Sequence, residues 1–191
     1  GIFVMVSSSK YIEHIKIFKI EYPILILSCV LGMMIMISSN DLIVFYLGLE
    51  LQSLSLYVLA SFNRENILSA ESGLKYFVLS ALSSGLLLYG CSLIYGFSGS
   101  TNFNEIAFND QNVQYGVTFG IVFVLVGLAF KISAVPFHMW APDVYQGSPT
   151  SVTAFFATLP KIAALTVFIR FLYVPFVNMI EQWQLIIIFL S

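Results

Sequence analysis

Long apolar segments with almost no charge recur along this chain, and they constrain its fold more than any other feature. They are five windows at residues 22–39, 42–62, 73–97, 113–135 and 150–173. Each is close to the roughly 20 helical residues that cross the ~30 Å hydrocarbon core of a bilayer. In the whole chain 9% of residues are charged, against about 25% in soluble domains. The sequence therefore predicts an all-α, polytopic transmembrane helix bundle with about five spans.

The segments outside these windows have a different character. The first 21 residues include "KYIEHIKIFKIE", in which lysines recur among apolar residues, so we expect a segment that lies along the membrane surface. The last apolar run, "WQLIIIFLS", is shorter than a span, which predicts a truncated sixth helix. The predicted organisation is a surface segment at 1–21, a five-helix transmembrane repeat at 22–173 and a truncated helix at 174–191.

Composition excludes several classes of function. A net charge of −2 provides no basic surface for a nucleic acid. Cys29 and Cys91 lie inside apolar windows, where cysteine usually acts as a small buried hydrophobic residue. Neither of the two histidines stands at metal-ligand spacing to a cysteine, so no metal site is predicted. The chain also lacks a nucleophile–base set, which argues against a self-contained membrane enzyme.

Basic residues outside the spans predict the orientation. Arg64 and three lysines of segment 1–21 fall on one side, whereas Arg170 and the faintly acidic loop 98–112 fall on the other. The positive-inside rule places the first side in the cytoplasm or the mitochondrial matrix. Two arginines among many Phe, Ile and Asn residues indicate an AT-rich coding sequence. We therefore predict the mitochondrial inner membrane, with a bacterial plasma membrane as the alternative.

Four ionisable residues interrupt the predicted spans: Glu50, Lys75, Lys131 and Lys161. Glu50 and Lys161 fall near the middle of their spans, where a charge costs at least ~2.5–3.5 kcal/mol. Such residues must face the protein interior or water. Lys75 and Lys131 lie near span ends, so their side chains have the alternative of extending to the headgroups.

Two functions are compatible with these charges. The first is a structural ion pair that holds helices together, with Glu50 and one of the lysines as partners. The second is a proton relay, because burial and a nearby opposite charge change the proton affinity of a lysine in opposite directions. A lysine whose acidic partner approaches or recedes would therefore bind and release protons. The residues alone leave both alternatives open.

A cluster of prolines follows Lys131 in "FKISAVPFHMWAPDVYQGSPT", residues 130–150. Proline removes a helical hydrogen bond, and lipid does not tolerate free backbone groups, so the broken region must be buried or line a water-filled cavity. Broken helices recur at the ion sites of transporters. We therefore predict one discontinuous helix near residues 131–145, the alternative being an ordinary interhelical loop. The prolines that we assign to helix breaks are Pro136, Pro142, Pro149 and Pro160.

Three other residues of this stretch, His138, Trp140 and Tyr145, are of types that occur at membrane interfaces. His138 is also a candidate member of the proton relay. The alternative for His138 is a structural hydrogen bond.

Three stretches of this chain resemble the antiporter-like membrane subunits of respiratory complex I, most closely the subunit 2 branch. They are "FYLGLELQSLSLYVLASFNREN", "AESGLKYFVLSALSSGLLLYGCSLIYGFSGST" and "FKISAVPFHMWAPDVYQGSPTSVTAFFATLPKIA". The resemblance runs from about residue 22 to 173 without large gaps. The third stretch is the most specific, because it combines "PFHxWxPDxYxGxP" with a lysine at a fixed distance.

The resemblance implies a fold of two inverted five-helix repeats, of which only the first is present here. It implies that Glu50 pairs with Lys131, that Lys161 is the connecting lysine, and that Lys75 is a further lysine of the subunit 2 branch. In that family these residues carry protons across the membrane, driven by quinone reduction elsewhere in the complex. No cofactor is expected on this chain, whereas flavin, iron–sulfur clusters and ubiquinone are expected on other subunits.

The resemblance also implies partners. They are the other subunits of the complex I membrane arm and the membrane lipids, together with a separate chain that supplies the missing second repeat. Two alternatives remain at this stage: a truncated scaffold that does not pump, and a subunit of a multisubunit sodium/proton antiporter. The wording "DVYQGSP" favours the complex I member over the antiporter.

Overall fold

The computed structural model describes residues 2, 4–6, 8, 20–63, 65–106 and 111–190. The described part is helical, with α2 (Glu21–Ser38), α3 (Leu42–Ala60), α4 (Ile67–Ser98), α5 (Gln111–Ile132), α6 (Trp140–Gly147), α7 (Thr150–Tyr173), the 3₁₀ helix η1 (Val177–Met179) and α8 (Ile180–Leu190). Within it, five helices are long and apolar enough to cross a membrane: α2, α3, α4, α5 and α7. The prediction of an all-α polytopic bundle is confirmed. Most of the predicted surface segment 1–21 lies outside the described residues.

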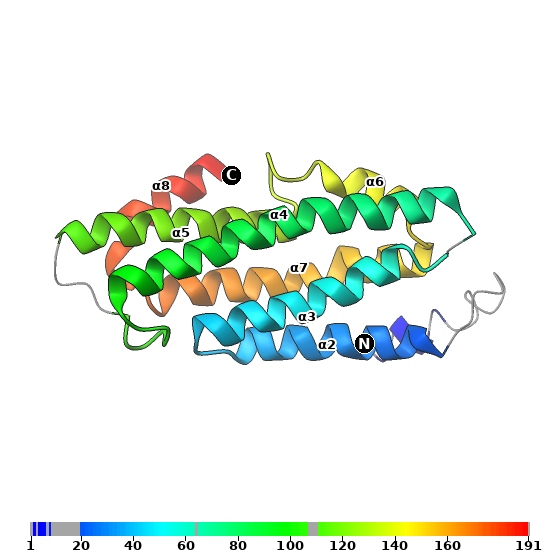
Figure 1. Ribbon diagram of the computed structural model, residues 1–191, viewed down its shortest axis with the longest axis horizontal. Helices are drawn as coiled ribbons and strands as arrows, with labels where there is room; N and C mark the ends of the chain where they lie inside the picture. The colour runs from blue at the N-terminus through cyan, green and yellow to red at the C-terminus, as the bar shows by residue number, and fades with distance from the viewer. Residues whose placement is uncertain are drawn as a thin grey trace.

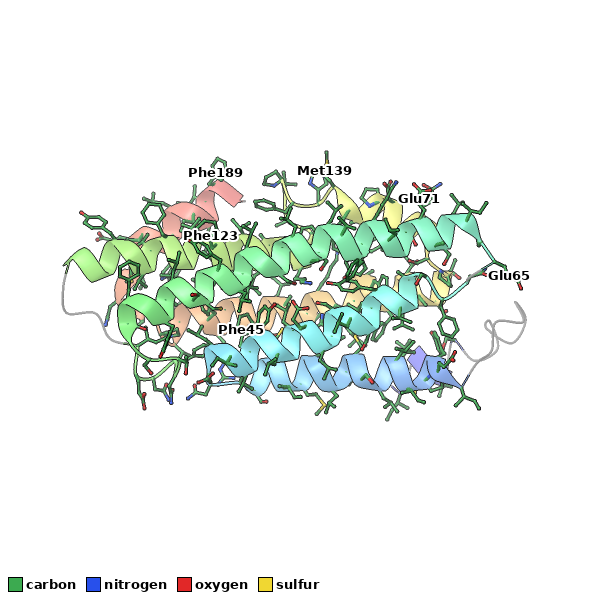
Figure 2. The ribbon with its side chains drawn as sticks, in the orientation of Figure 1. Phe45, Glu65, Glu71, Phe123, Met139 and Phe189 are labelled. Atoms are coloured by element: carbon green, nitrogen blue, oxygen red, sulfur yellow. The ribbon has the colours of Figure 1, made fainter. Side chains whose placement is uncertain are left out.

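The spanning helices lie side by side along the long axis of the molecule (Figure 1). α2 packs on α3 and α4 packs on α5, and α7 contacts α2, α3 and α5. The outer surface is apolar: Met139 and Phe189, which point away from the bundle in Figure 2, are 77% and 83% exposed. Phe45 in the interior is fully buried. A bundle with an apolar exterior needs lipid around it, because contact between so much apolar surface and water is unfavourable.

Glycines allow both helix pairs to approach closely. A Cβ atom on Gly32 of α2 would lie 2.6 Å from the backbone nitrogen of Gln52 in α3. A Cβ atom on Gly90 of α4 would lie 2.7 Å from the carbonyl oxygen of Gly120 in α5. Small residues at helix crossings are typical of membrane bundles, because association there depends on close packing.

One end of the bundle is tied together by polar contacts. Asp41 caps α3 by accepting a hydrogen bond from the Ile43 amide at 2.8 Å, and it also accepts one from the Thr101 hydroxyl at 2.5 Å. Arg170 of α7 donates to the carbonyl of Ile37 in the last turn of α2. Unpaired carbonyls at a helix C-terminus attract a cation. These contacts fix the α2–α3 turn against the loop after α4 and against α7.

α4 is longer than the apolar window predicted. The window began at residue 73, whereas the helix begins at Ile67 and the Asn66 side chain caps it by accepting from the Leu68 amide at 3.0 Å. Hydropathy locates the part of a helix that suits lipid, while the cap determines where the helix starts. Lys75 therefore lies two turns inside α4 rather than at its beginning.

The predicted discontinuous helix is present. α5 ends at Ile132, the seven residues 133–139 are not helical, and α6 begins at Trp140. Both half-helices pack on α4, one after the other along its length (Figure 1). The segment is therefore one interrupted helix rather than an ordinary interhelical loop.

The four prolines occupy different places. Only Pro136 lies in the break, after a cis peptide bond from Val135. Pro142 is in the first turn of α6, and Pro149 is the N-cap of α7, both positions where proline fits a helix start. Pro160 lies inside α7 without ending it. The prediction that all four mark helix breaks is thus wrong for Pro142, Pro149 and Pro160.

Candidate site at the helix break

The end of α5 is shaped by a left-handed residue. Ser133 has φ = 64°, the Ala134 amide donates to the Ala129 carbonyl at 2.9 Å, and the Ser133 amide donates to the Phe130 carbonyl at 3.1 Å. These two bonds form a Schellman motif, in which the left-handed position usually holds glycine. The motif ends the helix directly after Lys131 and leaves that residue on the last turn.

Lys131 is held by hydroxyl groups inside the bundle. Its Nζ donates to Ser53 Oγ of α3 at 2.7 Å and to Ser80 Oγ of α4 at 2.5 Å, and the residue is 8% exposed. The Tyr57 hydroxyl also donates to Ser80 Oγ, at 2.6 Å, and the Tyr57 ring centroid lies 5.8 Å from Nζ. We call Ser53, Tyr57 and Ser80 the hydroxyl cradle. The alternative in which Lys131 extends to the headgroups is excluded.

Glu50 and Lys131, both described by the structure, do not form the direct ion pair that was predicted: no pairing within 4.0 Å links them. Glu50 lies one turn before Ser53 on α3, so the two side chains project from the same side of the helix. Glu50 Oε1 is buried and has no hydrogen-bond partner in the described part of the chain. The carboxylate is therefore close to the cradle, with serine hydroxyls rather than the acid bound to the ammonium. A buried oxygen without a partner is a place for a water molecule or a proton.

Lys161 of α7 lies beside the second half-helix, α6. Its Nζ is 5.5 Å from the ring centroid of Tyr145 in α6, and no carboxylate in the described residues pairs with it within 4.0 Å. The Tyr145 hydroxyl is buried and has no partner among those residues. In the break, Nδ1 of His138 is likewise buried and unpaired in the described structure. The site thus contains several polar atoms that a buried water would satisfy.

Lys75 is at the surface, away from the cradle. Its Nζ lies 2.8 Å from Glu71 in the same helix and 2.8 Å from Asp143 in α6, and the three side chains are 42–53% exposed. Figure 2 shows Glu71 at the outer edge of the molecule. Exposed ion pairs contribute little to stability, because water and salt screen them. The structure brings Glu50 near Lys131 but does not bring Lys75 to either residue.

Sequence reasoning missed the serines. Ser53 in α3 and Ser80, Ser83 and Ser84 in α4 are all buried, and Ser83 Oγ donates to the Gly127 carbonyl of α5 at 3.3 Å. Their signal was the spacing of small polar residues at helical period inside apolar windows. Trp140 was interpreted as an interfacial residue, but it is 4% exposed and lies in the interior.

This arrangement defines a class of protein. A buried lysine beside a helix break, surrounded by hydroxyl groups in a bundle of apolar spanning helices, is typical of membrane proteins that move ions. The described residues contain no group of three or more His, Cys, Asp or Glu side chains that could hold a metal ion.

Comparison with known proteins identifies the family. The family model described as "NADH:quinone oxidoreductase/Mrp antiporter, TM" matches residues 39–191. Because this match covers more than half of the chain, the chain belongs to that family.

Individual relatives agree. The chain is 76% identical over 191 residues to NADH-quinone oxidoreductase subunit N of Pelagibacter ubique, covering 100% of this chain and 41% of the relative. A chain of respiratory complex I from Thermus thermophilus matches with a TM-score of 0.72 and 39% identity over 80% of this chain and 34% of that one. A chain of the Mrp complex from Dietzia sp. matches with a TM-score of 0.73 and 29% identity over 81% and 29%. The chain spans about two-fifths of the length of its Pelagibacter relative.

Proposed function

We propose that this chain is part of a proton-translocating membrane subunit of NADH:quinone oxidoreductase, and that it moves protons while quinone is reduced elsewhere in the complex. The observation that carries the proposal is the Lys131 ammonium, buried beside a helix break and bound to two serine hydroxyls. The 76% identity to an NADH-quinone oxidoreductase subunit N supports the assignment to that enzyme. The enzyme activity belongs to the complex, and we expect its redox centres on other subunits.

The geometry suggests how a proton would move. The Lys131 ammonium gives a proton to Ser80 Oγ as Ser80 passes its own proton to a water molecule beyond it, so the proton leaves on that water, the hydroxyl is regenerated and Lys131 becomes neutral. Glu50 stabilises the charged form when its carboxylate is close, and favours release when it is protonated. Lys161 and His138 are the candidates for the next steps, and the unpaired Tyr145 hydroxyl and His138 Nδ1 are places for intervening water. Lys75 is left out of the relay because it is paired at the surface.

The same proposal implies the partners, the cofactors of other subunits and the membrane in which the chain lies. Partners are other membrane-arm subunits and lipids, and flavin, iron–sulfur clusters and ubiquinone belong to other subunits. The relatives compared above are bacterial, which favours the plasma membrane over the mitochondrial inner membrane. The separate chain predicted to supply a second repeat stays a prediction, and the Pelagibacter relative is more than twice as long as this chain.

Replacement of Lys131 by alanine tests the proposal. In membranes that contain the assembled complex, we expect Lys131→Ala to lower the number of protons moved per NADH oxidised, because the relay loses its buried cation. Ser55→Ala is the control, because the buried Ser55 hydroxyl on α3 bonds the Leu51 carbonyl of its own helix and does not touch Lys131. An unchanged ratio in Lys131→Ala would leave the scaffold alternative. Proton movement that requires sodium ions would instead support the antiporter alternative, which the Mrp likeness keeps open.

A further inference from the structure

The break leaves one backbone carbonyl in an unusual position. In a continuous helix the Phe130 carbonyl would accept from the amide of Ala134, but that amide donates to Ala129 instead. The Phe130 carbonyl accepts from the Ser133 amide at 3.1 Å and from the indole Nε1 of Trp140 at 2.9 Å. Trp140 is the first residue of α6. Its side chain therefore reaches back across the break and binds the end of α5.

The indole ring also stacks on two other aromatic rings. It stacks on the Phe130 ring with centroids 5.5 Å apart and on the Tyr76 ring of α4 with centroids 4.7 Å apart. Trp140 is 4% exposed. Such ring pairs contribute about 0.5–1.5 kcal/mol each beyond the area that they bury. The two half-helices are thus joined to each other and to α4 by one side chain.

Two sets of contacts connect the Trp140 side chain to Lys131. The first is the backbone, because Phe130 directly precedes Lys131. The second runs through Tyr76, whose ring meets the Tyr57 ring edge-on with centroids 5.0 Å apart. The Tyr57 hydroxyl donates to the same Ser80 oxygen that binds the lysine ammonium. The positions of Lys131 and of the hydroxyl cradle therefore both depend on residues that Trp140 contacts.

We propose that Trp140 is a positioning residue that keeps the Lys131 ammonium on the hydroxyl cradle by clamping α5 to α6 across the break. This inference rests on the proposed function of Lys131 in proton transfer. Backbone groups at a break lack helical partners, and the membrane interior provides no bulk water to replace them. The indole N–H supplies a second donor to the Phe130 carbonyl, beside the Ser133 amide, and the stacked rings fix its direction. Without it the last turn of α5 is free to move and the distance from Lys131 to Ser80 is no longer fixed.

The test compares two tryptophans with the same chemistry. Trp183 in α8 also donates from Nε1 to a phenylalanine carbonyl, that of Phe176 at 3.0 Å, and is 6% exposed, but it is distant in sequence from the break. Trp140→Phe and Trp183→Phe each remove one indole N–H and one ring. Both are measured beside Lys131→Ala in membranes containing the assembled complex, with the number of protons moved per NADH oxidised as the readout. This ratio is independent of the amount of complex present.

We expect the number of protons per NADH in Trp140→Phe to fall most of the way to the value of Lys131→Ala. In Trp183→Phe it should equal that of the unmodified complex. Three outcomes overturn the inference or its basis. A normal ratio in Trp140→Phe beside a low one in Lys131→Ala overturns the role of Trp140 and leaves the proposed function intact. Equal losses in both tryptophan variants mean a general packing defect. A normal ratio in Lys131→Ala overturns the proposed function itself.

A second variant covers the case in which Trp140→Phe does not assemble. Tyr76→Leu removes the ring stacked on the indole and leaves the hydrogen bond to the Phe130 carbonyl. We expect an assembled complex with a ratio between those of the unmodified complex and Lys131→Ala. A ratio equal to that of the unmodified complex overturns the inference in this case as well.

Discussion

Lys131 is a buried cation whose nearest polar partners are neutral. A hydroxyl oxygen accepts a hydrogen bond from an ammonium without cancelling its charge, so the interior keeps a net positive charge when the lysine is protonated. That charge remains sensitive to the Glu50 carboxylate, which lies one turn from Ser53 on α3, since Coulomb interactions are stronger where the effective dielectric constant is low. The cradle therefore fixes the position of Lys131 and leaves its charge open to control by Glu50.

Ser80→Ala is the direct test of the cradle. The substitution removes the oxygen that lies 2.5 Å from Lys131 Nζ and 2.6 Å from the Tyr57 hydroxyl. A hydrogen bond to a charged group contributes about 1.5–3 kcal/mol. We expect fewer protons per NADH in the assembled complex, because the protonated form of Lys131 loses this stabilisation.

Ser55→Ala is the matched control for the cradle. Ser55 is 5% exposed on α3, and its hydroxyl donates to the Leu51 carbonyl of its own helix at 2.9 Å. Its removal should leave the proton ratio unchanged. Equal ratios in Ser80→Ala and Ser55→Ala would show that the cradle does not act in proton transfer.

Lys75 gives a second prediction at this scale. Because its ion pairs with Glu71 and Asp143 are exposed and screened by water, we expect Lys75→Ala to lower stability only slightly. Thermal unfolding of the purified complex at low and high salt measures this, and the difference from the unmodified complex should shrink at high salt. A loss of proton transfer with normal stability would return Lys75 to the relay.

The positions of the charged residues could be predicted from sequence, whereas their neighbours could not. A glutamate or lysine inside an apolar window is visible because the energetic penalty of burial is large. Serine carries no such penalty, and the contact between Ser53 and Lys131 joins residues 78 positions apart. The sequence therefore indicated an acid as the partner of Lys131, since only charge could be recognised. The hydrogen bond from the Trp140 indole to the Phe130 carbonyl could not be predicted either, because neither group carries a charge.

At the scale of the helix, the interruption could be foreseen but its boundaries could not. Pro136 and the prolines after it indicate that a regular helix cannot continue. The end of α5 is instead set by Ser133, a non-glycine residue with positive φ, which sequence patterns do not identify. Pro142 and Pro149 are compatible with helix starts, because the N–H that proline lacks would have no helical partner there.

The α4–α5 crossing supplies a prediction about the helices. In Gly90→Ala the new Cβ would lie 2.7 Å from the Gly120 carbonyl oxygen, so the two backbones must separate. Overpacking of this kind costs about 1–3 kcal/mol. We expect a lower melting temperature and less assembled complex in membranes.

Gly85→Ala provides the comparison for this crossing within the same helix. Nothing lies within 4 Å of a Cβ atom built on Gly85, and alanine is favoured over glycine in a helix by about 1 kcal/mol. Gly85→Ala should therefore be neutral or stabilising. Similar melting temperatures for the two variants would show that α4 and α5 do not meet at Gly90.

At the scale of the whole molecule, hydropathy was sufficient to predict the bundle. Five apolar windows became five spanning helices in the described residues, because lipid requires every backbone group to be paired within its own helix. Which helices pair could not be read from hydropathy. The pairing depends on small residues such as Gly32 and Gly48, whose spacing brings α2 and α3 into contact.

The two ends of the bundle face opposite sides of the membrane, and their assignment is testable. Glu65 lies at the end where α3 meets α4, at the edge of the molecule in Figure 2, and the loop containing Asn104 joins α4 to α5 at the opposite end (Figure 1). From the basic residues of the sequence, the positive-inside rule predicts that the first end lies in the cytoplasm. We expect Glu65→Cys to react with a membrane-impermeant maleimide only in inverted vesicles, and Asn104→Cys only in right-side-out vesicles.

The native Cys29 and Cys91 are buried, 0% and 6% exposed, so the unmodified chain should stay unlabelled. The reverse labelling pattern would invert the orientation and place the Glu71–Lys75–Asp143 cluster, together with α6, on the far side of the membrane.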